Sequence, residues 1–236
     1  MARWGMRFVI AAAVLAVSMA AAAARTIDLA LVLAVDVSGS VNAERFELQR
    51  QGYAKAFASR EVIDAIAAGE HSTIAVTLVE WSGATHQRQM VGWTIISDAN
   101  SAIAFGSAIS ETPRAFADWT SISGALDFAL VLFDQVEGVT PLRRVIDVSG
   151  DGINNNGRPI NDARSDVVNA GVTINGLPIL TEYPTLDDYY RDNVIGGPGS
   201  FVVAVSDFDG FGNAILGKLV REIAGSAKPG IILAGH

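Results

Sequence analysis

Five side chains in three short segments have the residue types and spacing of a metal site. They are Asp36, Ser38, Ser40, Thr120 and Asp151. The first three occupy alternate positions of one loop, so a carboxylate and two hydroxyls can turn inward together. Hard oxygen ligands of this kind suit Mg²⁺, Ca²⁺ or Mn²⁺, whereas zinc favours His or Cys. The alternative for Asp36 and Ser38 is that they cap the helix expected after them.

The positions of these residues depend on strands and helices that alternate along the chain from residue 27 onward. Apolar runs of strand length cover 27–36, 73–81, 87–96, 143–149, 171–179 and 201–206. Helical periodicity covers 41–57, with Asn42 as N-cap, and then 98–109, 122–133, 161–169 and 211–223, with a short helix expected near 186–191. This order predicts an α/β, doubly wound (Rossmann-like) sheet of six mostly parallel strands, with helices on both faces. Because only residues 82–86 separate two of the strands, 87–96 is expected to be antiparallel.

In such a sheet, ligands bind at the carboxyl ends of the strands. Asp36 ends the first strand, Asp151 ends the strand 143–149, and Thr120 comes just before the helix at 122–133. The order Asp-x-Ser-x-Ser, Thr and Asp-Gly resembles the metal-ion-dependent adhesion site (MIDAS) of von Willebrand factor A domains. The resemblance covers residues 27–224. It implies that the hydroxyls contact the ion, that Asp36 and Asp151 bind directly or through water, and that one position stays open for an acidic group of a partner.

The blocks 143–152, 173–179 and 189–205 also resemble an exported bacterial subgroup of this superfamily with no assigned function. Two positions depart from the commoner superfamily pattern. Gly150 replaces a Thr before the Asp-Gly pair, and Asp147 replaces an apolar residue within a strand. A buried Asp147 needs a partner. We expect Arg143 or Arg144 to be this partner. The alternative is that Asp147 supports a metal ligand from behind without contacting the ion.

The amino-terminal segment has the plan of a secretory signal peptide. Arg3 and Arg7 precede an apolar run, and small residues at 20–24 suit cleavage after Ala24. An uncleaved anchor is the alternative. Residues 25–236 then form one domain, periplasmic or secreted, with no membrane insertion after cleavage. Loss of the two arginines leaves 15 basic against 25 acidic residues, a net charge of about −10, which disfavours nucleic acid. Without cysteine, no disulfide stabilises the domain.

Enzymatic alternatives lack necessary residues. An aspartate-based phosphotransferase wants a second carboxylate at position 38, which is serine. A serine hydrolase needs a histidine in reach, and none of His71, His86 and His236 has an evident reason to lie at the crevice. The sequence therefore predicts a non-enzymatic, metal-dependent protein-binding module for a partner that presents Asp or Glu, with Mg²⁺ as the preferred ion. A scaffold with a loop-stabilising ion is the alternative, followed by a metal-dependent hydrolase.

Two further features lie beside the predicted site. Asn154, Asn155 and Asn156 follow Asp151 and are interpreted as a polar rim, with simple turn formation as the alternative. Trp119 precedes Thr120 and is expected either to line the ligand surface or to pack in the core, as we expect of Trp81 and Trp93.

Overall fold

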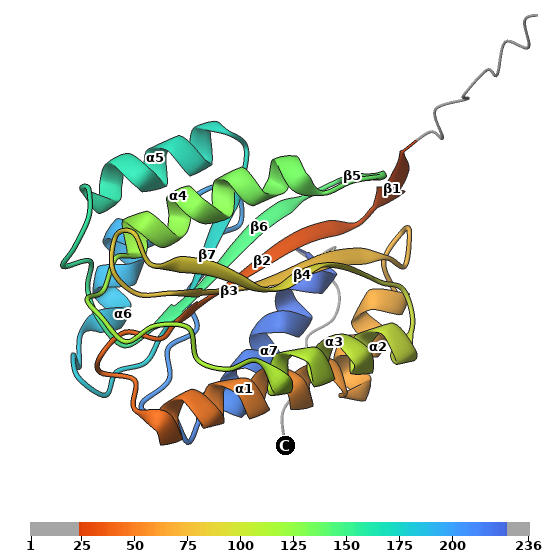
Figure 1. Ribbon diagram of the computed structural model, residues 1–236. Coiled ribbons are helices and arrows are strands. Elements are labelled where there is room, and N and C mark those ends of the chain that lie inside the picture. Colours follow the sequence, from red (N-terminus) through yellow and green to blue (C-terminus); the bar gives the residue numbers. More distant parts are fainter. Residues whose placement is uncertain (1–23, 226–236) are drawn as a thin grey trace, which may run out of the picture.

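A five-stranded sheet forms the centre of the computed structural model, which describes residues 24–225 (Figure 1). Apart from its last residue, the predicted signal peptide lies outside the described residues. The strand order is β4-β3-β2-β6-β7, and β4 is antiparallel to its neighbour as predicted. The strands are β2 (Leu29–Asp36), β3 (Ile74–Trp81), β4 (Gln87–Ile96), β6 (Arg144–Gly150) and β7 (Thr173–Pro178). A separate parallel pair, β1 (Arg25–Ile27) with β5 (Val139–Pro141), was not predicted.

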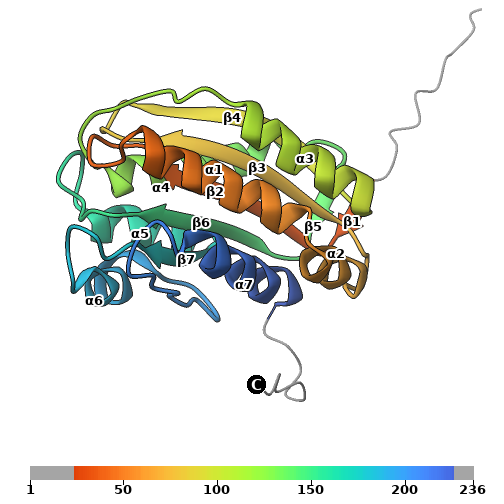
Figure 2. The same ribbon diagram turned by 90° about the horizontal axis from the view of Figure 1, so that it is seen from below.

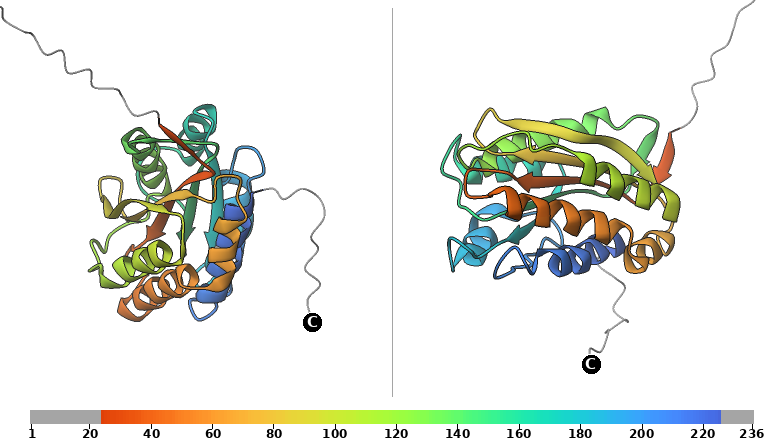
Figure 3. Two further views of the ribbon diagram at one scale, coloured as in Figure 1. Left: turned by 90° about the vertical axis from the view of Figure 1, so that its right-hand side faces the viewer. Right: turned by 60° about the horizontal axis from the view of Figure 1, so that its bottom comes forward.

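Helices cover both faces of the sheet (Figures 2 and 3). One face packs against α1 (Ala43–Phe57), α2 (Arg60–Ala67), α3 (Ala99–Glu111) and α7 (Phe211–Ala224). The other face packs against α4 (Ile122–Leu132), α5 (Ile160–Asn169) and α6 (Leu186–Tyr189), which continues as one π-helical turn at Tyr190–Val194. A 3-10 turn, Phe133–Gln135, ends α4. The arrangement is the predicted doubly wound α/β fold. No helix among residues 24–225 is long and apolar enough to span a membrane.

The central strand β2 shows why the fold has two layers of helices. All eight of its residues are buried, and successive side chains point to opposite faces. Leu29, Leu31 and Leu33 enter the core beneath α1 and α7, whereas Ala30 and Val32 enter the core beneath α4. A continuous apolar run of this kind is typical of a parallel strand that helices cover on both sides.

The predicted sixth strand, 201–206, is reduced to two isolated bridges beside β7. Gly176 pairs with Val202, and Ile179 pairs with Val205. The backbone explains the interruption: Val203 donates to the carbonyl of Gly176 and Val205 donates to that of Pro178. Because Pro178 has no N–H, it cannot donate the ladder bond that belongs between them.

Asp147 has a buried partner, but not the one predicted. Its carboxylate pairs with the ammonium group of Lys218 on α7 at 2.5 Å, and Lys218 also pairs with Glu222 at 2.5 Å. Arg143 instead donates to the carbonyls of Glu222 and Ile223, and Arg144 donates to that of Ala170. The prediction considered only arginines near in sequence, whereas the fold brings the lysine from the last helix.

Candidate metal centre

Four loops border a cavity of about 440 Å³ at the carboxyl end of the sheet. Three of them follow β2, precede α4 and follow β6, as the sequence predicts, and the fourth follows β7. The cavity is lined by Gly39, Ser40, Asp118, Trp119, Thr120, Asp151, Gly152, Asn155, Glu182 and Tyr183. Ser40, Thr120 and Asp151 are thus brought to one cavity, and Asp36 and Ser38 lie buried behind its wall.

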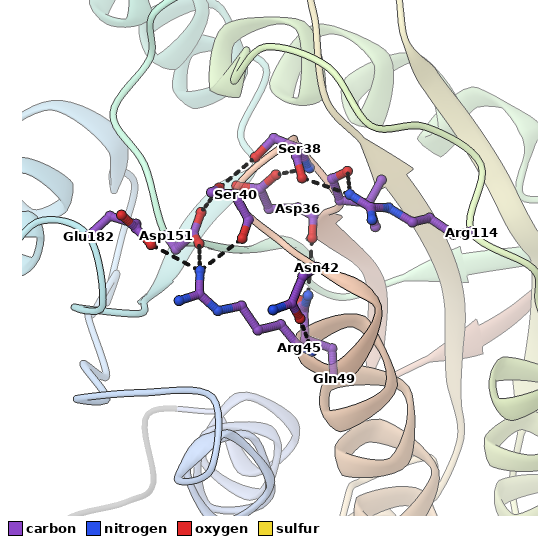
Figure 4. A network of polar contacts seen from close by, with 10 residues as sticks. Asp36, Ser38, Ser40, Asn42, Arg45, Gln49, Arg114, Asp151 and Glu182 are labelled. Carbon is purple, nitrogen blue, oxygen red and sulfur yellow. Dashed lines mark hydrogen bonds and ion pairs between the residues drawn. The ribbon is translucent and has the colours of Figure 1, made fainter.

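Hydrogen bonds connect four of the five predicted ligands (Figure 4). The backbone N–H of Ser38 donates to Oδ1 of Asp36 at 2.7 Å. The hydroxyls of Ser38 and Ser40 lie 3.3 Å apart, and the Ser40 hydroxyl donates to Oδ1 of Asp151 at 2.6 Å. The loop after β2 and the loop after β6 therefore direct their oxygen atoms toward each other.

Asp36 is the most confined of these carboxylates. Its side chain is fully buried, and Oδ2 has no hydrogen-bond partner among the described residues. Burial, followed by the charge of Asp151, raises the pKa of Asp36 to about 7, although hydrogen bonds from Ser38 act in the opposite direction. Burial also raises the pKa of Asp151. Two acids that disfavour each other's charge form an environment that would favour a cation.

The backbone of the loop after β2 is fixed from three sides. Nε2 of Gln49 donates to the carbonyl of Asp36 at 3.1 Å, and Nη2 of Arg114 donates to the carbonyls of Val37 and Ser38 at 2.8 Å each. The N–H of Gly39 donates to the carbonyl of Asp118 at 2.8 Å. Gln49 and Arg114 were missed from the sequence because they bind backbone atoms, which leave no pattern of paired residue types.

Thr120 is held by the asparagine run instead of by the loop after β2. Its N–H donates to Oδ1 of Asn155 at 2.9 Å, and its carbonyl accepts from the N–H groups of Asn155 and Asn156. The side chains of Asn154 and Asn156 likewise accept from Ser123 and Ala84. The three asparagines are therefore ties between loops, and Asn155 also lines the cavity, in agreement with the predicted polar rim.

The departure at Gly150 has a steric explanation. A Cβ atom at this position would lie 2.8 Å from Oδ2 of Asp36 and 3.0 Å from the hydroxyl of Tyr190. Tyr190 is fully buried, and burial, followed by the charge of Asp36, raises its pKa. The tyrosine thus occupies the space that a side chain at position 150 would need. Sequence reasoning missed Tyr190 because no spacing in the sequence connects it with Gly150 or Asp36.

Arg45 supplies a positive charge at the edge of the site. Its Nη1 atom donates to the carbonyl of Ser40 at 2.8 Å and to Oε1 of Glu182 at 3.0 Å, and it lies 3.5 Å from Oδ2 of Asp151. The guanidinium also lies over the ring of Phe208. Arg45 is one turn into α1, whose N-cap is Asn42 as predicted, so the start of this helix positions the arginine.

The donor set fits a hard divalent cation. Two carboxylates and the hydroxyls of Ser38 and Ser40 form one connected group, and Thr120 Oγ1 would lie 3.3 Å from a Cβ atom built at Gly152, next to Asp151. Within residues 24–225, no group of three or more His, Cys, Asp or Glu side chains that could hold a metal ion is present, so hydroxyls would have to complete this donor set. Oxygen ligands with few charges are typical of Mg²⁺ and related ions.

One histidine lies closer to the cavity than the sequence indicated. Nδ1 of His86 lies 3.0 Å from Oδ2 of Asp118, which lines the cavity, and its ring stacks on Phe116. No pattern in the sequence indicated this position of His86, which contacts a lining residue but is not part of the lining itself. The reason is the β3–β4 hairpin, which folds back beside the loop before α4.

Comparison with solved structures shows the fold. The chain is similar to proximal thread matrix protein 1 from the mussel byssus, with a TM-score of 0.61 and 18% identity over 85% of this chain and 47% of that one. A von Willebrand factor type A protein from Catenulispora acidiphila gives 0.59 and 16% identity over 84% of this chain and 43% of that one. This chain thus spans less than half of either protein. One structure of the mussel protein is described as having a zinc occupied MIDAS motif.

A third structure matches nearly end to end. It is the vWF domain of the type V pili tip protein Mfa5 from Porphyromonas gingivalis, with a TM-score of 0.59 and 10% identity over 89% of this chain and 99% of that one. No curated protein sequence matches this chain. Residues 26–227 match the family described as "Protein of unknown function (DUF1194)". The chain therefore belongs to the DUF1194 family, and its fold is that of a von Willebrand factor A domain.

Proposed function

We propose that this protein is an exported interaction module in which a divalent ion, Mg²⁺ in the first place, captures a carboxylate of a protein partner. Asp36, Ser38, Ser40, Thr120 and Asp151 would hold the ion, with Ca²⁺ or Mn²⁺ as alternatives. The bound ion supplies an electrophilic position at the cavity. The chain's own residues bind it, orient it and limit how a partner approaches.

One observation carries the proposal: Asp36 and Asp151 are buried together without a buried cation to neutralise them. Within residues 24–225, Asp36 Oδ2 has no hydrogen-bond donor, and Asp151 forms one ion pair, with the partly exposed Arg45 at 3.5 Å. A buried carboxylate in this state costs free energy, which a bound divalent ion would offset. Two carboxylates bring the net charge of the occupied site to about zero and leave no excess of negative charge. The ion could therefore still take up an external carboxylate.

Recognition suits these residues better than turnover. Among the described residues, the cavity lining holds no histidine, and the Asp151 carboxylate already accepts from the Ser40 hydroxyl and lies beside Arg45. Asp36, whose Oδ1 accepts from the Ser38 N–H, is fully buried and is not part of the lining. General acid and base work needs a group free to exchange a proton with substrate. The matching folds support the same direction, because one is a thread matrix protein and another is a pilus tip domain.

Metal binding is tested first. Isothermal titration with Mg²⁺, Ca²⁺ and Mn²⁺ is expected to give one site in the native chain and none in Asp36→Ala. Asp64→Ala, which changes an exposed carboxylate on α2, is the matched control and should bind as the native chain does. Unchanged affinity in Asp36→Ala would remove the metal centre from consideration.

Partner capture is tested next, with extract of the envelope or culture fluid of the source cells passed over immobilised protein. A partner is expected to stay bound in Mg²⁺ and to leave in EDTA, and Thr120→Ala should weaken capture more than it lowers the free energy of unfolding. A scaffold in which the ion only fixes the loops predicts the opposite: a partner that stays bound in EDTA. Metal-dependent hydrolysis of a phosphate or peptide substrate, lost in Asp36→Ala, would replace both with an enzyme.

Export is tested by intact mass. Protein recovered from outside the cytoplasm should begin at Arg25 if the signal peptide is cleaved after Ala24. Material that still begins at Met1 would indicate a retained anchor.

A further inference from the structure

Two exposed aromatic side chains stand at the candidate metal centre. Among residues 24–225, the large apolar side chains that face solvent are Ile95, Ile103, Trp119, Val131, Leu142 and Tyr183. The aromatic members of this set, Trp119 at 63% exposure and Tyr183 at 44%, both line the cavity that contains Ser40, Thr120 and Asp151. Large exposed aromatic groups beside a concave site are typical of binding surfaces.

The backbone on both sides of Trp119 is fixed. The carbonyl of Asp118 accepts from Gly39 at 2.8 Å, and the N–H of Thr120 donates to Asn155 at 2.9 Å. The indole therefore projects from an anchored segment that also carries a candidate metal ligand. A side chain presented in this way loses little conformational entropy when a partner contacts it.

Tyr183 belongs to another loop of the cavity lining. Its neighbour Glu182 is tied to Arg45 at 3.0 Å, and the carbonyl of Tyr183 accepts from Leu186 at the start of α6. The segment that carries Tyr183 is therefore attached to α1 on one side and to α6 on the other. The two aromatic groups come from separate loops, so a ligand that contacts both must bridge these loops.

The negative charge of the cavity lining limits how many acidic groups the ligand can carry. Asp118 and Glu182 also line the cavity, and the chain has a net charge of −8. A run of acidic residues would be repelled by these carboxylates, whereas one carboxylate placed on the ion would not. The rest of the ligand has to suit the aromatic walls, which favour apolar or aromatic groups.

We infer that the cavity recognises an extended peptide segment with a single Asp or Glu next to a large apolar or aromatic residue. The acidic side chain would reach the ion, and the neighbouring side chain would pack against Trp119 and Tyr183. A cavity of about 440 Å³ is within the usual range for such a ligand group. This inference rests on the proposed function and adds to it the residues that determine specificity.

The test is a library of linear heptapeptides displayed on phage, selected on the mature chain in Mg²⁺ and eluted with EDTA. Enriched sequences are expected to contain one acidic residue with a large apolar residue within two positions. For the best of them, made as a synthetic peptide, Trp119→Ala and Tyr183→Ala should each raise Kd tenfold or more. Both variants should keep native Mg²⁺ affinity, which shows that they still fold.

Leu142→Ala is the matched control, because Leu142 is 56% exposed and lies outside the cavity. It should leave the peptide Kd unchanged. Enrichment of acidic peptides without apolar neighbours would overturn the specificity inference. A peptide Kd of Trp119→Ala and Tyr183→Ala equal to that of the native chain would do the same. In both cases the proposed function stands. If Mg²⁺ binds and EDTA elutes no acidic peptide, the proposed function fails and the inference fails with it.

Discussion

Strand β6 and the loop after it each contribute one aspartate to a pair of buried carboxylates, and the two pairs differ in how their charge is balanced. Asp147, within the strand, shares Lys218 with Glu222, and all three side chains are fully buried. Asp151, just beyond the strand, lies with Asp36, and within residues 24–225 the only ion pair of these two carboxylates is with the partly exposed Arg45 at their edge. One pair has its cation built into the chain, whereas the other lacks it.

The difference separates a structural cluster from a candidate site. The first cluster is closed: Glu222 also accepts from Asn175 at 2.9 Å, and Lys218 has no solvent-exposed surface. The second borders a cavity, and among the described residues no cationic side chain pairs with Asp36. The free energy cost of buried charge is therefore offset internally in one place and is left for an external ion in the other.

Replacing the built-in cation is expected to have the largest effect. Lys218→Met leaves Asp147 and Glu222 buried together without a positive charge and should lower the free energy of unfolding by about 3–5 kcal/mol near pH 8. Urea unfolding at fixed pH measures it. The triple variant with Asp147→Asn and Glu222→Gln added should recover most of the loss. A single variant as stable as the native chain would show that the lysine does not balance these acids.

The closed cluster also predicts a pH dependence. Burial, followed by the charge of Asp147, raises the pKa of Glu222 from 4.5 to about 7. Because the folded state holds this proton more tightly, the contribution to stability is fully present below pH 4.5 and is lost as the pH rises through 7. The loss amounts to about 3 kcal/mol. Glu222→Gln should flatten the decline in the free energy of unfolding over this range, whereas the exposed control Glu61→Gln should not.

The open pair should respond to metal instead. Asp36→Asn removes a buried charge, so without metal the variant is expected to be at least as stable as the native chain at pH 8, the opposite sign to Lys218→Met. At an Mg²⁺ concentration 100 times Kd, the native chain gains about 2.7 kcal/mol and the variant gains nothing. Thermal or urea unfolding with and without Mg²⁺ measures both. An equal gain in the variant would contradict the assignment of Asp36 as a ligand.

The smallest effect is expected at the edge of the open pair. Arg45 lies 3.5 Å from Asp151 and opposes a second cation there. Arg45→Met should therefore lower the Kd for Mg²⁺ by roughly two- to threefold at low ionic strength, an effect that salt screens. Arg60→Met, on the exposed surface of α2, is the control. A weaker Mg²⁺ affinity in Arg45→Met would show that the arginine mainly holds the loop in place.

Much of the fold follows from periodicity. The bounds predicted for the hairpin strand 87–96 coincide with β4, and the expected N-cap of α1 at Asn42 is confirmed. The failure at 201–206 has a local cause, because the segment has the composition of a strand and the interruption comes from Pro178 on its neighbour. The residue pattern of one segment does not show which backbone N–H donors are missing from the adjacent strand.

The candidate site was predictable where loops follow strands. Asp36 and Asp151 are each the end of an apolar run, and the sheet brings such ends together. Residues that act through tertiary contact were not predictable in this way. Lys218 lies in the last helix and reaches Asp147 only because α7 packs on the sheet, and Tyr190 reaches the space above Gly150 from a π-helical turn. No spacing in the sequence joins these pairs.

The two ends of the described chain lie at the end of the sheet where strands β2 and β6 begin, away from the cavity. Arg25 is in β1, ahead of the central strand, and the end of α7 is held there by Arg143, which donates to Glu222 and Ile223 just before β6 begins. The cavity lies beyond the other ends of β2 and β6, roughly 20–25 Å away for strands of this length. A tether at either end would therefore point the cavity outward, so an affinity tag or sensor surface attached at Arg25 leaves the approach of a partner unobstructed.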